Sequence, residues 1–261
     1  MDLSLSGKTA IVSNGCSPFG SAVAARLLQE GARVAIGGQD ARALWGAIAA
    51  LGAHGEARAI PMPEGDPAAG MPQMVRAAVV TFGAPDILVA DVCAPLEGTL
   101  DAVPAERLAQ YLRDGLVALW AFVQAGAAHM PKEGGGRIIV LVNAAGKIPS
   151  SDFLAAAVLG AAQHAFVKSV SDHFGPKGIT VNAVCVGAAA PGPQARSIGA
   201  EPYLGRGLGQ QESGWGTAPP LGRWCTPDQV ADAVAFLASA RAGFVTGANI
   251  DVDGGQQRMI F

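Results

Sequence analysis

Short apolar runs alternate with longer segments of helical period along the whole chain, and this alternation constrains the fold more than any other feature. Runs of about four to six mainly apolar residues are typical of buried strands, whereas apolar residues three or four apart indicate helices. Strands joined by helices in this order favour a doubly wound parallel sheet with helices on both faces. The expected strands are 8–13, 33–36, 57–61, 86–90, 137–142, 178–182 and 249–252, and the expected helices are 21–30, 40–51, 72–82, 105–130, 152–174 and 227–238.

Length and composition fit one α/β domain that spans residues 1–261. With 261 residues, of which 50% are hydrophobic and 15% charged, the chain can bury an ample single core. The sequence contains no internal repeat and no linker, and glycines close several expected helices, as at Gly31, Gly52 and Gly83. We therefore expect a single Rossmann-like domain.

Charge and hydropathy exclude several classes of function. The net charge of −3 and a pI near 5.8 leave no basic surface for nucleic acid or for an anionic membrane. No apolar run of about 18 residues and no leader peptide are visible, so we expect a soluble, cytoplasmic protein. The four cysteines (Cys16, Cys93, Cys185 and Cys225) lack the spacing of a metal site, so we expect no metal.

Five stretches of the sequence resemble framework segments of the short-chain dehydrogenase/reductase family. They are 5–10, 86–89, 136–138, 178–184 and 251–255. They follow the family's order and are distributed over nearly the whole chain. The resemblance implies a Rossmann-like fold, an NAD(P) site in the loop after the first strand, and a catalytic set of Ser, Tyr, Lys and Asn. In that set the Tyr exchanges a proton, the Lys lowers the Tyr pKa from about 10 and holds the cofactor ribose, the Ser binds the carbonyl, and the Asn orders a proton relay.

The positions of this catalytic set carry unreactive residues here. Counting back from the stretch 178–182, the family's Tyr falls on Ala156, its Lys on Gly160 and its Ser on Asn143, and its Asn falls on Gly115. Ala and Gly have no titratable group, and an Asn amide can hydrogen-bond a carbonyl but cannot act as a general acid. We therefore expect no catalytic residue in this chain.

The loop that would hold the cofactor phosphates is incomplete as well. The family pattern Thr-Gly-x-x-x-Gly-x-Gly places its glycines on Asn14, Pro18 and Gly20, so only the last one is kept. Asn14 tolerates a left-handed turn and Gly15 can substitute for it. Pro18 has no N–H group, and its ring fills space beside the pyrophosphate.

Other cofactor positions weaken the expected site further. The resemblance puts the ribose-binding acid on Gly38 and the Arg for a 2′-phosphate on Gln39. Asp91 follows the fourth strand, where its charge would repel a pyrophosphate unless the side chain turned away. We therefore expect no cofactor-binding residues and no cofactor in this chain, and NAD in an active partner subunit.

One further pair of titratable residues flanks the altered catalytic positions. Asp152 and His164 share a helical face with Ala156 and Gly160, but a separation of about 12 residues at ~1.5 Å rise places them roughly 18 Å apart. They cannot act as a pair. We interpret His164 as a packed or surface histidine and Asp152 as an acid at the helix start.

These observations lead to an expected function of assembly rather than chemistry. We expect a non-catalytic subunit of a hetero-oligomeric NAD(P)-dependent alcohol or hydroxyacyl-CoA dehydrogenase, paired with an active paralogue in a heterotetramer through the helices 105–130 and 152–174. The alternatives are a repurposed non-redox enzyme (cyclase, dehydratase or lyase) in the emptied pocket, and a ligand sensor.

The segment 187–223 stands where the family has its substrate lid, and we expect Trp215 and Trp224 to pack on a ligand or on the base of the lid. The tail 256–261 is expected to dock at a subunit interface.

Overall fold

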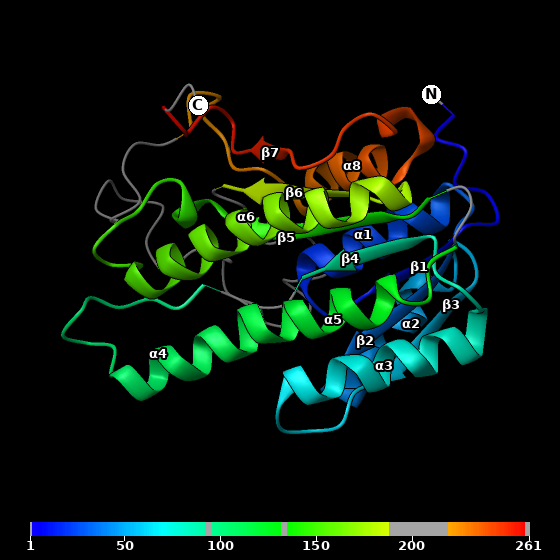
Figure 1. Cartoon of the computed structure of the whole chain (residues 1–261), viewed down its shortest axis with the longest axis horizontal. Helices are drawn as coiled ribbons and strands as arrows, with labels where there is room; N and C mark the ends of the chain where they lie inside the picture. The colour runs from blue at the N-terminus through cyan, green and yellow to red at the C-terminus, as the bar shows by residue number, and fades with distance from the viewer. Residues whose placement is uncertain (1, 92–94, 132–134, 188–218, 259–261) are drawn as a thin grey trace.

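A computed structural model describes residues 2–91, 95–131, 135–187 and 219–258. Its centre is a seven-stranded, fully parallel sheet in the order β3-β2-β1-β4-β5-β6-β7 (Figure 1). This topology confirms the doubly wound sheet expected from the sequence. The strands are β1 (Thr9–Val12), β2 (Arg33–Gly38), β3 (Ala57–Pro61), β4 (Ile87–Ala90), β5 (Arg137–Asn143), β6 (Thr180–Val186) and β7 (Asn249–Val252).

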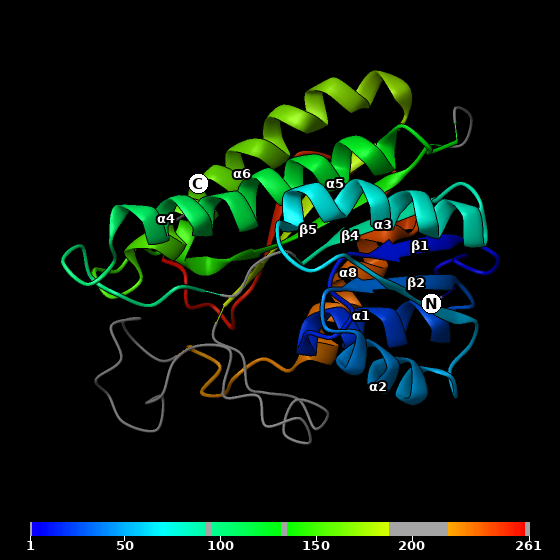
Figure 2. The same ribbon diagram turned by 90° about the horizontal axis from the view of Figure 1, so that it is seen from below.

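Helices cover both faces of the sheet (Figure 2). One face packs against α1 (Pro18–Gln29), α2 (Ala41–Leu51) and α8 (Pro227–Ala238), and the other against α3 (Pro67–Phe82), α5 (Ala118–Ala127) and α6 (Leu154–Phe174). Two apolar cores therefore lie on opposite sides of the strands. Because helices bury both faces, the central strands are apolar at almost every position, and all seven residues of β6 are buried.

The expected helix 105–130 differs from the observed one. It consists of α4 (Ala105–Leu112), a five-residue π-turn η1 (Arg113–Val117) and α5. Gly115 lies in the π-turn, where an added Cβ would stand 2.9 Å from the Leu159 Cδ1 atom. The extra residue of a π-turn locally widens a helix, and such turns often accompany functional sites. The close packing of the Gly115 backbone against Leu159 leaves no periodic signal in the sequence. The π-turn within the expected helix 105–130 was therefore not predicted.

Several helix starts also differ from the expected ones. α1 begins at Pro18 instead of Ser21, because Ser17 caps it and proline suits the first helical position. α3 begins at Pro67 instead of Pro72, because Asp66 caps it; Pro72 is tolerated inside the helix. Within the described part of the chain, no helix has both the length and the apolar character needed to cross a membrane.

Candidate functional site

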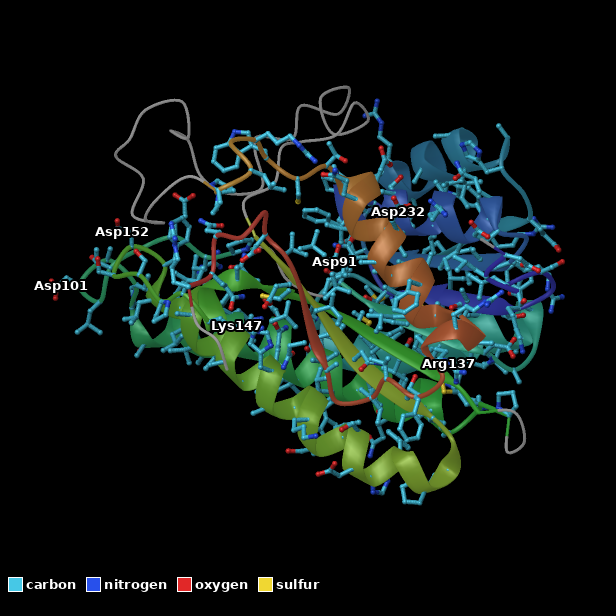
Figure 3. All side chains as sticks on the ribbon, turned by 90° about the horizontal axis from the view of Figure 1, so that it is seen from above. Asp91, Asp101, Arg137, Lys147, Asp152 and Asp232 are labelled. Atoms are coloured by element: carbon cyan, nitrogen blue, oxygen red, sulfur yellow. The ribbon has the colours of Figure 1, made fainter. Side chains whose placement is uncertain are left out.

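The candidate site lies where the carboxyl ends of β1 and β4 meet. The chain winds away from these two neighbouring strands in opposite directions, which opens a crevice that ligands use in sheets of this kind. The loop after β1 leads into α1, and Asp91 follows β4 directly. Asn143 ends β5, and Gly187 follows β6. In Figure 3 Asp91 lies near the centre of the molecule.

The loop after β1 runs tightly against its surroundings. The Gly15 N–H donates to the Gly37 carbonyl over 2.9 Å, and a Cβ added at Gly15 would lie 2.7 Å from the Ile36 Cγ2 atom. A Cβ added at Gly20 would lie 2.8 Å from the Asn14 carbonyl carbon. Only glycine fits these two positions, so the loop retains the close backbone packing of a dinucleotide-binding turn.

The amino end of α1 offers fewer donors than such turns usually provide. Pro18 is its first residue and has no N–H group. The Gly20 N–H donates to the Ser17 Oγ atom over 2.8 Å. The Ser17 hydroxyl in turn donates to the Asp91 carboxylate. A side-chain carboxylate thus lies at the positive end of the helix, where an anion is stabilised.

Asp91 is fixed at this place by both its backbone and its side chain. Its N–H donates to the Ser13 Oγ atom over 2.9 Å, and the Ser13 hydroxyl donates back to the Asp91 carbonyl over 3.2 Å. The residue is only 3% exposed. The side chain has not turned away from the loop, so a bound pyrophosphate would meet a negative charge there.

A small cavity adjoins the Asp91 carboxylate. Its volume of about 20 Å³ suits roughly one water molecule. Asn143 also lines this cavity; its Oδ1 atom accepts the Ala145 N–H over 2.8 Å, so the carboxamide is fixed through its oxygen. The lining residues are Phe19, Asp91, Leu141, Val142, Asn143, Val186 and Gly187.

The positions of the family's Tyr, Lys and Asn are closed by packing. Ala156 is 1% exposed and belongs to a small apolar cluster on which Trp224 also packs. A Cβ added at Gly160 would lie 2.8 Å from the Gly146 Cα atom, because the short helix η2 (Ala144–Gly146) rests directly on α6. At Gly115 the carbonyl accepts the Gln163 amide over 3.4 Å. No side chain enters the crevice from Gly115, Ala156 or Gly160.

Asp152 and His164 do not form a pair, as expected. Asp152 is exposed and precedes α6, which begins at Leu154 (Figure 3). The His164 Nδ1 atom lies 2.7 Å from the Asn249 Oδ1 atom. Burial lowers the pKa of the His164 ring, and the nearby Lys147 charge also lowers it. His164 is therefore a packed histidine.

The sequence did not indicate a polar cluster beside His164. The Lys147 Nζ atom pairs with the Asp251 Oδ1 atom at 2.7 Å, and the Gln257 Nε2 atom donates to the same oxygen over 2.9 Å. Lys147 follows the helix η2, and its side chain is 18% exposed (Figure 3). In the sequence, only a lysine directly after Gly146 indicates this cluster. Its partner Asp251 lies on β7, far along the chain, so no sequence spacing links the two residues. Gln257, near the start of the expected docking tail, forms hydrogen bonds with Asp251 and Asp253 of its own chain. Residues 259–261 of that tail lie outside the described ranges, and so does Trp215.

The described cysteines provide no reactive thiol. Burial, with a smaller effect of the Asp40 charge, raises the pKa of Cys16 to about 11. Burial likewise raises the pKa of Cys225 to about 11. At neutral pH both stay protonated, and protonated thiols are poor nucleophiles. Across the ranges that the structure describes, no group of three His, Cys, Asp or Glu side chains is placed to hold a metal ion.

Comparisons with known proteins match this chain almost from end to end. The family model described as enoyl-(acyl carrier protein) reductase matches residues 16–257. An L-rhamnose 1-dehydrogenase (NAD(P)(+)) of Azotobacter vinelandii is 34% identical, over 95% of this chain and 96% of its own. A 2,5-dichloro-2,5-cyclohexadiene-1,4-diol dehydrogenase of Sphingobium indicum is 29% identical, over 96% of each chain.

Solved structures agree with these relatives. A short-chain dehydrogenase/reductase from Serratia marcescens superposes with a TM-score of 0.82 at 30% identity, over 97% of this chain and 98% of that one. A blue fluorescent protein from a metagenomic library, solved in complex with NADPH, gives a TM-score of 0.83 at 28% identity, with coverage of 97% and 98%.

These relatives correct the function expected from the sequence. We expected a non-catalytic subunit because Gly115, Asn143, Ala156 and Gly160 replace the family's catalytic set. That expectation is wrong, since the relatives matched along the full length are named as dehydrogenases. Both names refer to substrates with hydroxyl groups, so the expected acyl-CoA substrate gains no support either.

The expected absence of a cofactor is not supported. One relative is named for NAD(P)(+), and one similar structure was solved in complex with NADPH. The resemblance seen in the framework segments 5–10, 86–89, 136–138, 178–184 and 251–255 thus extends to whole chains and whole folds. On both grounds, this chain belongs to the short-chain dehydrogenase/reductase family.

Proposed function

We propose that this chain is an NAD(P)-dependent oxidoreductase that acts on a small hydroxyl-bearing compound or on the corresponding carbonyl. One observation carries the proposal: a tight glycine turn at the crevice of the sheet adjoins a cavity that Asp91 and Asn143 line. The substrate class follows from the names of the relatives, a sugar dehydrogenase and a diol dehydrogenase.

The residues present fit a dinucleotide in shape. Gly15 packs on Ile36 and Gly20 packs on the Asn14 backbone, so the turn is compact, and a dinucleotide would lie beside it with its phosphates near the amino end of α1. When bound, the nicotinamide accepts a hydride from the carbon of an alcohol, or returns it to a carbonyl. Pro18 provides no N–H group to the phosphates, and the Asp91 carboxylate repels their negative charge. We therefore expect this chain to bind the cofactor more weakly than a chain with a complete glycine loop does.

The chain's own residues orient the substrate and exclude water. The Asn143 carboxamide, held at its oxygen by the Ala145 N–H, can donate an N–H to the substrate oxygen. The apolar cluster around Ala156, with Trp224 packed against it, gives this part of the site an apolar wall. Neither Ala156 nor Gly160 exchanges a proton, so another group must perform that step.

We also propose that the outer face of α5 and α6 binds a second chain of the same family. A groove of about 550 Å³ runs between these helices, and it is mainly apolar. Trp120, on its edge, is 58% exposed and packs its ring against Phe166 at a centroid distance of 5.7 Å. Exposing this surface is costly, since a large apolar side chain gains about 1.5–3 kcal/mol on burial. The partner is an active paralogue, as expected from the sequence; a second copy of this chain is the other outcome of the test.

The experiment is a titration of the purified chain with NADH and NADPH, followed by turnover assays with sugars and cyclic diols. We expect binding of at least one reduced cofactor and formation of reduced nicotinamide from one alcohol class. The control is Gly20→Val, whose side chain would collide with the Asn14 carbonyl and close the turn. Absence of binding and turnover in the unaltered chain would contradict the proposal, as would equal binding by Gly20→Val.

A further inference from the structure

Among the described residues, one ionisable side chain lines the small cavity in the crevice, where the proposed reaction needs a proton carrier. Of the residues that line the small cavity, Asp91 alone is titratable; the others are apolar residues, the amide Asn143 and Gly187. We propose that the Asp91 carboxylate takes the proton of the substrate hydroxyl and returns it in the reverse direction, with Asn143 donating a hydrogen bond to the same oxygen. This inference rests on the proposed oxidoreductase function.

The surroundings of Asp91 keep its carboxylate ionised, which is the form that can accept a proton. The Ser17 hydroxyl and the amino end of α1 stabilise the ionised form, and the backbone clamp at Ser13 fixes the position of the side chain. With 3% of the residue exposed, the group is shielded from bulk water. The adjoining cavity of about 20 Å³ can hold the one water that links the carboxylate to a substrate oxygen beside Asn143.

The proton balance of the step is simple. As the alcohol is oxidised, its O–H bond breaks, and the O–H electron pair becomes the second bond of the carbonyl. The proton moves to the carboxylate of Asp91, directly or through the water, and the carbinol C–H bond would give its hydride to NAD(P)+ when this cofactor is bound. The carboxylic acid then releases the proton to solvent. Reduction runs through the same positions in reverse, so that the acid supplies the proton.

The other titratable groups near the crevice are engaged elsewhere. Lys147 pairs with Asp251, and His164 contacts Asn249, both beside β7 at the far edge of the sheet. Neither lines the cavity. In the loop after β1, the Cys16 thiol has its pKa raised to about 11 by burial, so it stays protonated at neutral pH. No Lys, Arg or His lines the cavity among the described residues.

The position of Asp91 gives the test two readouts of opposite direction. The carboxylate that would accept the proton also lies beside the amino end of α1, near enough to the cofactor phosphates for its charge to repel them. Replacing it by the neutral, isosteric Asn removes a negative charge near the phosphates but also removes the proton carrier. A residue with a merely structural role would weaken binding and turnover together.

The experiment compares the full-length chain with Asp91→Asn. We expect the variant to bind NADPH about three- to tenfold more tightly at low salt, since one like charge is lost. We also expect kcat for the alcohol to fall roughly 100-fold or more, the usual contribution of a general acid or base. The matched control, Asp101→Asn, removes the same charge from an exposed residue that does not line the cavity, so cofactor binding and kcat should both stay close to those of the unaltered chain.

Each outcome decides between the inference and the function on which it rests. If Asp91→Asn binds cofactor and turns over like the unaltered chain, the inference is overturned, while the proposed function stands. If the unaltered chain neither binds cofactor nor turns over, the proposed function itself fails. Should the variant fold poorly, the pH profile of the unaltered chain decides: oxidation should fall toward acid pH as the carboxylate gains its proton. A profile that is flat between about pH 4 and 9 would overturn the inference.

Discussion

At the scale of single residues, close packing decides what this site can do. The sequence showed that Gly160 lacks the family's lysine, but not that the space for such a side chain is filled by Gly146. It showed Asp91 after a strand, but not the hydrogen bond from Ser17, which lies 74 residues away. Residue identity could be read from the sequence, whereas these contacts depend on strand order and on the approach of backbones.

Restoring the family's lysine therefore has a predictable cost. Gly160→Lys should lower the free energy of unfolding by about 1–3 kcal/mol, because the added side chain overpacks the contact with Gly146. Gly46 is the matched control: it is also helical, but an added Cβ there meets nothing within 4 Å. Gly46→Lys should be neutral or stabilise by up to about 1 kcal/mol.

Urea unfolding of both glycine variants measures these differences. The double variant Ala156→Tyr/Gly160→Lys should gain no turnover, because the loop after β5 would have to move before the two side chains reached the crevice. Equal stability of the two lysine variants, or activity gained by the double variant, would show that the junction of η2 and α6 is not closed.

At the scale of elements, period and caps predicted which segments form strands and helices, but not every boundary. The helical period alone could not reveal the π-turn at Arg113–Val117, because the pattern of apolar residues continues through it. α3 begins earlier than expected because Asp66 caps it, and the Asp66 carboxylate also contacts Arg113 at the start of the π-turn. One side chain thus ties two elements together.

The contact between Asp66 and Arg113 predicts a pH-dependent contribution to stability. The Arg113 guanidinium, with help from backbone N–H groups, holds the pKa of Asp66 below its usual range. A depressed pKa in the folded state means that the stabilisation is present above the unfolded pKa of about 3.9 and is lost as pH falls through the folded value.

Asp66→Asn tests this contribution because Asn keeps the helix cap and loses only the charge. We expect a small loss of stability at neutral pH, since the pair is at the surface. The loss should disappear as the pH falls below about 4. Urea midpoints of both proteins at neutral and acid pH measure it, and a difference that persisted unchanged at acid pH would rule out the ion pair as its cause.

At the scale of the whole molecule, the fold followed from the sequence and the function did not. The alternation of strands and helices predicted the sheet and its two helical layers correctly. Four altered positions, Gly115, Asn143, Ala156 and Gly160, suggested an inactive chain, yet the full-length relatives are named as dehydrogenases. A missing family residue excludes one route for a proton, but another group in the same crevice can provide a different route.

The apolar face of α5 and α6 leads to a prediction about assembly. Trp120→Glu should shift the chain toward the monomer, because it places a charge in the surface proposed to be buried. Trp45 is the matched control, since it is 59% exposed, against 58% for Trp120, but lies on α2, away from the groove. Sedimentation velocity of the unaltered chain and of both variants, each alone and each mixed with the paralogue, should show dissociation only for Trp120→Glu; the same mass for all three proteins in the mixtures would contradict the proposal.

The most direct test of the central claim follows the hydride itself. A sugar or cyclic diol that carries deuterium on its carbinol carbon is incubated with NAD(P)+ and the purified chain, and the nicotinamide is analysed by mass spectrometry. The account predicts reduced cofactor that carries deuterium, in an amount that depends on the unaltered crevice and falls roughly 100-fold or more in rate for Asp91→Asn. Reduced cofactor without deuterium, or none above the level of Gly20→Val across the substrate panel, would contradict it.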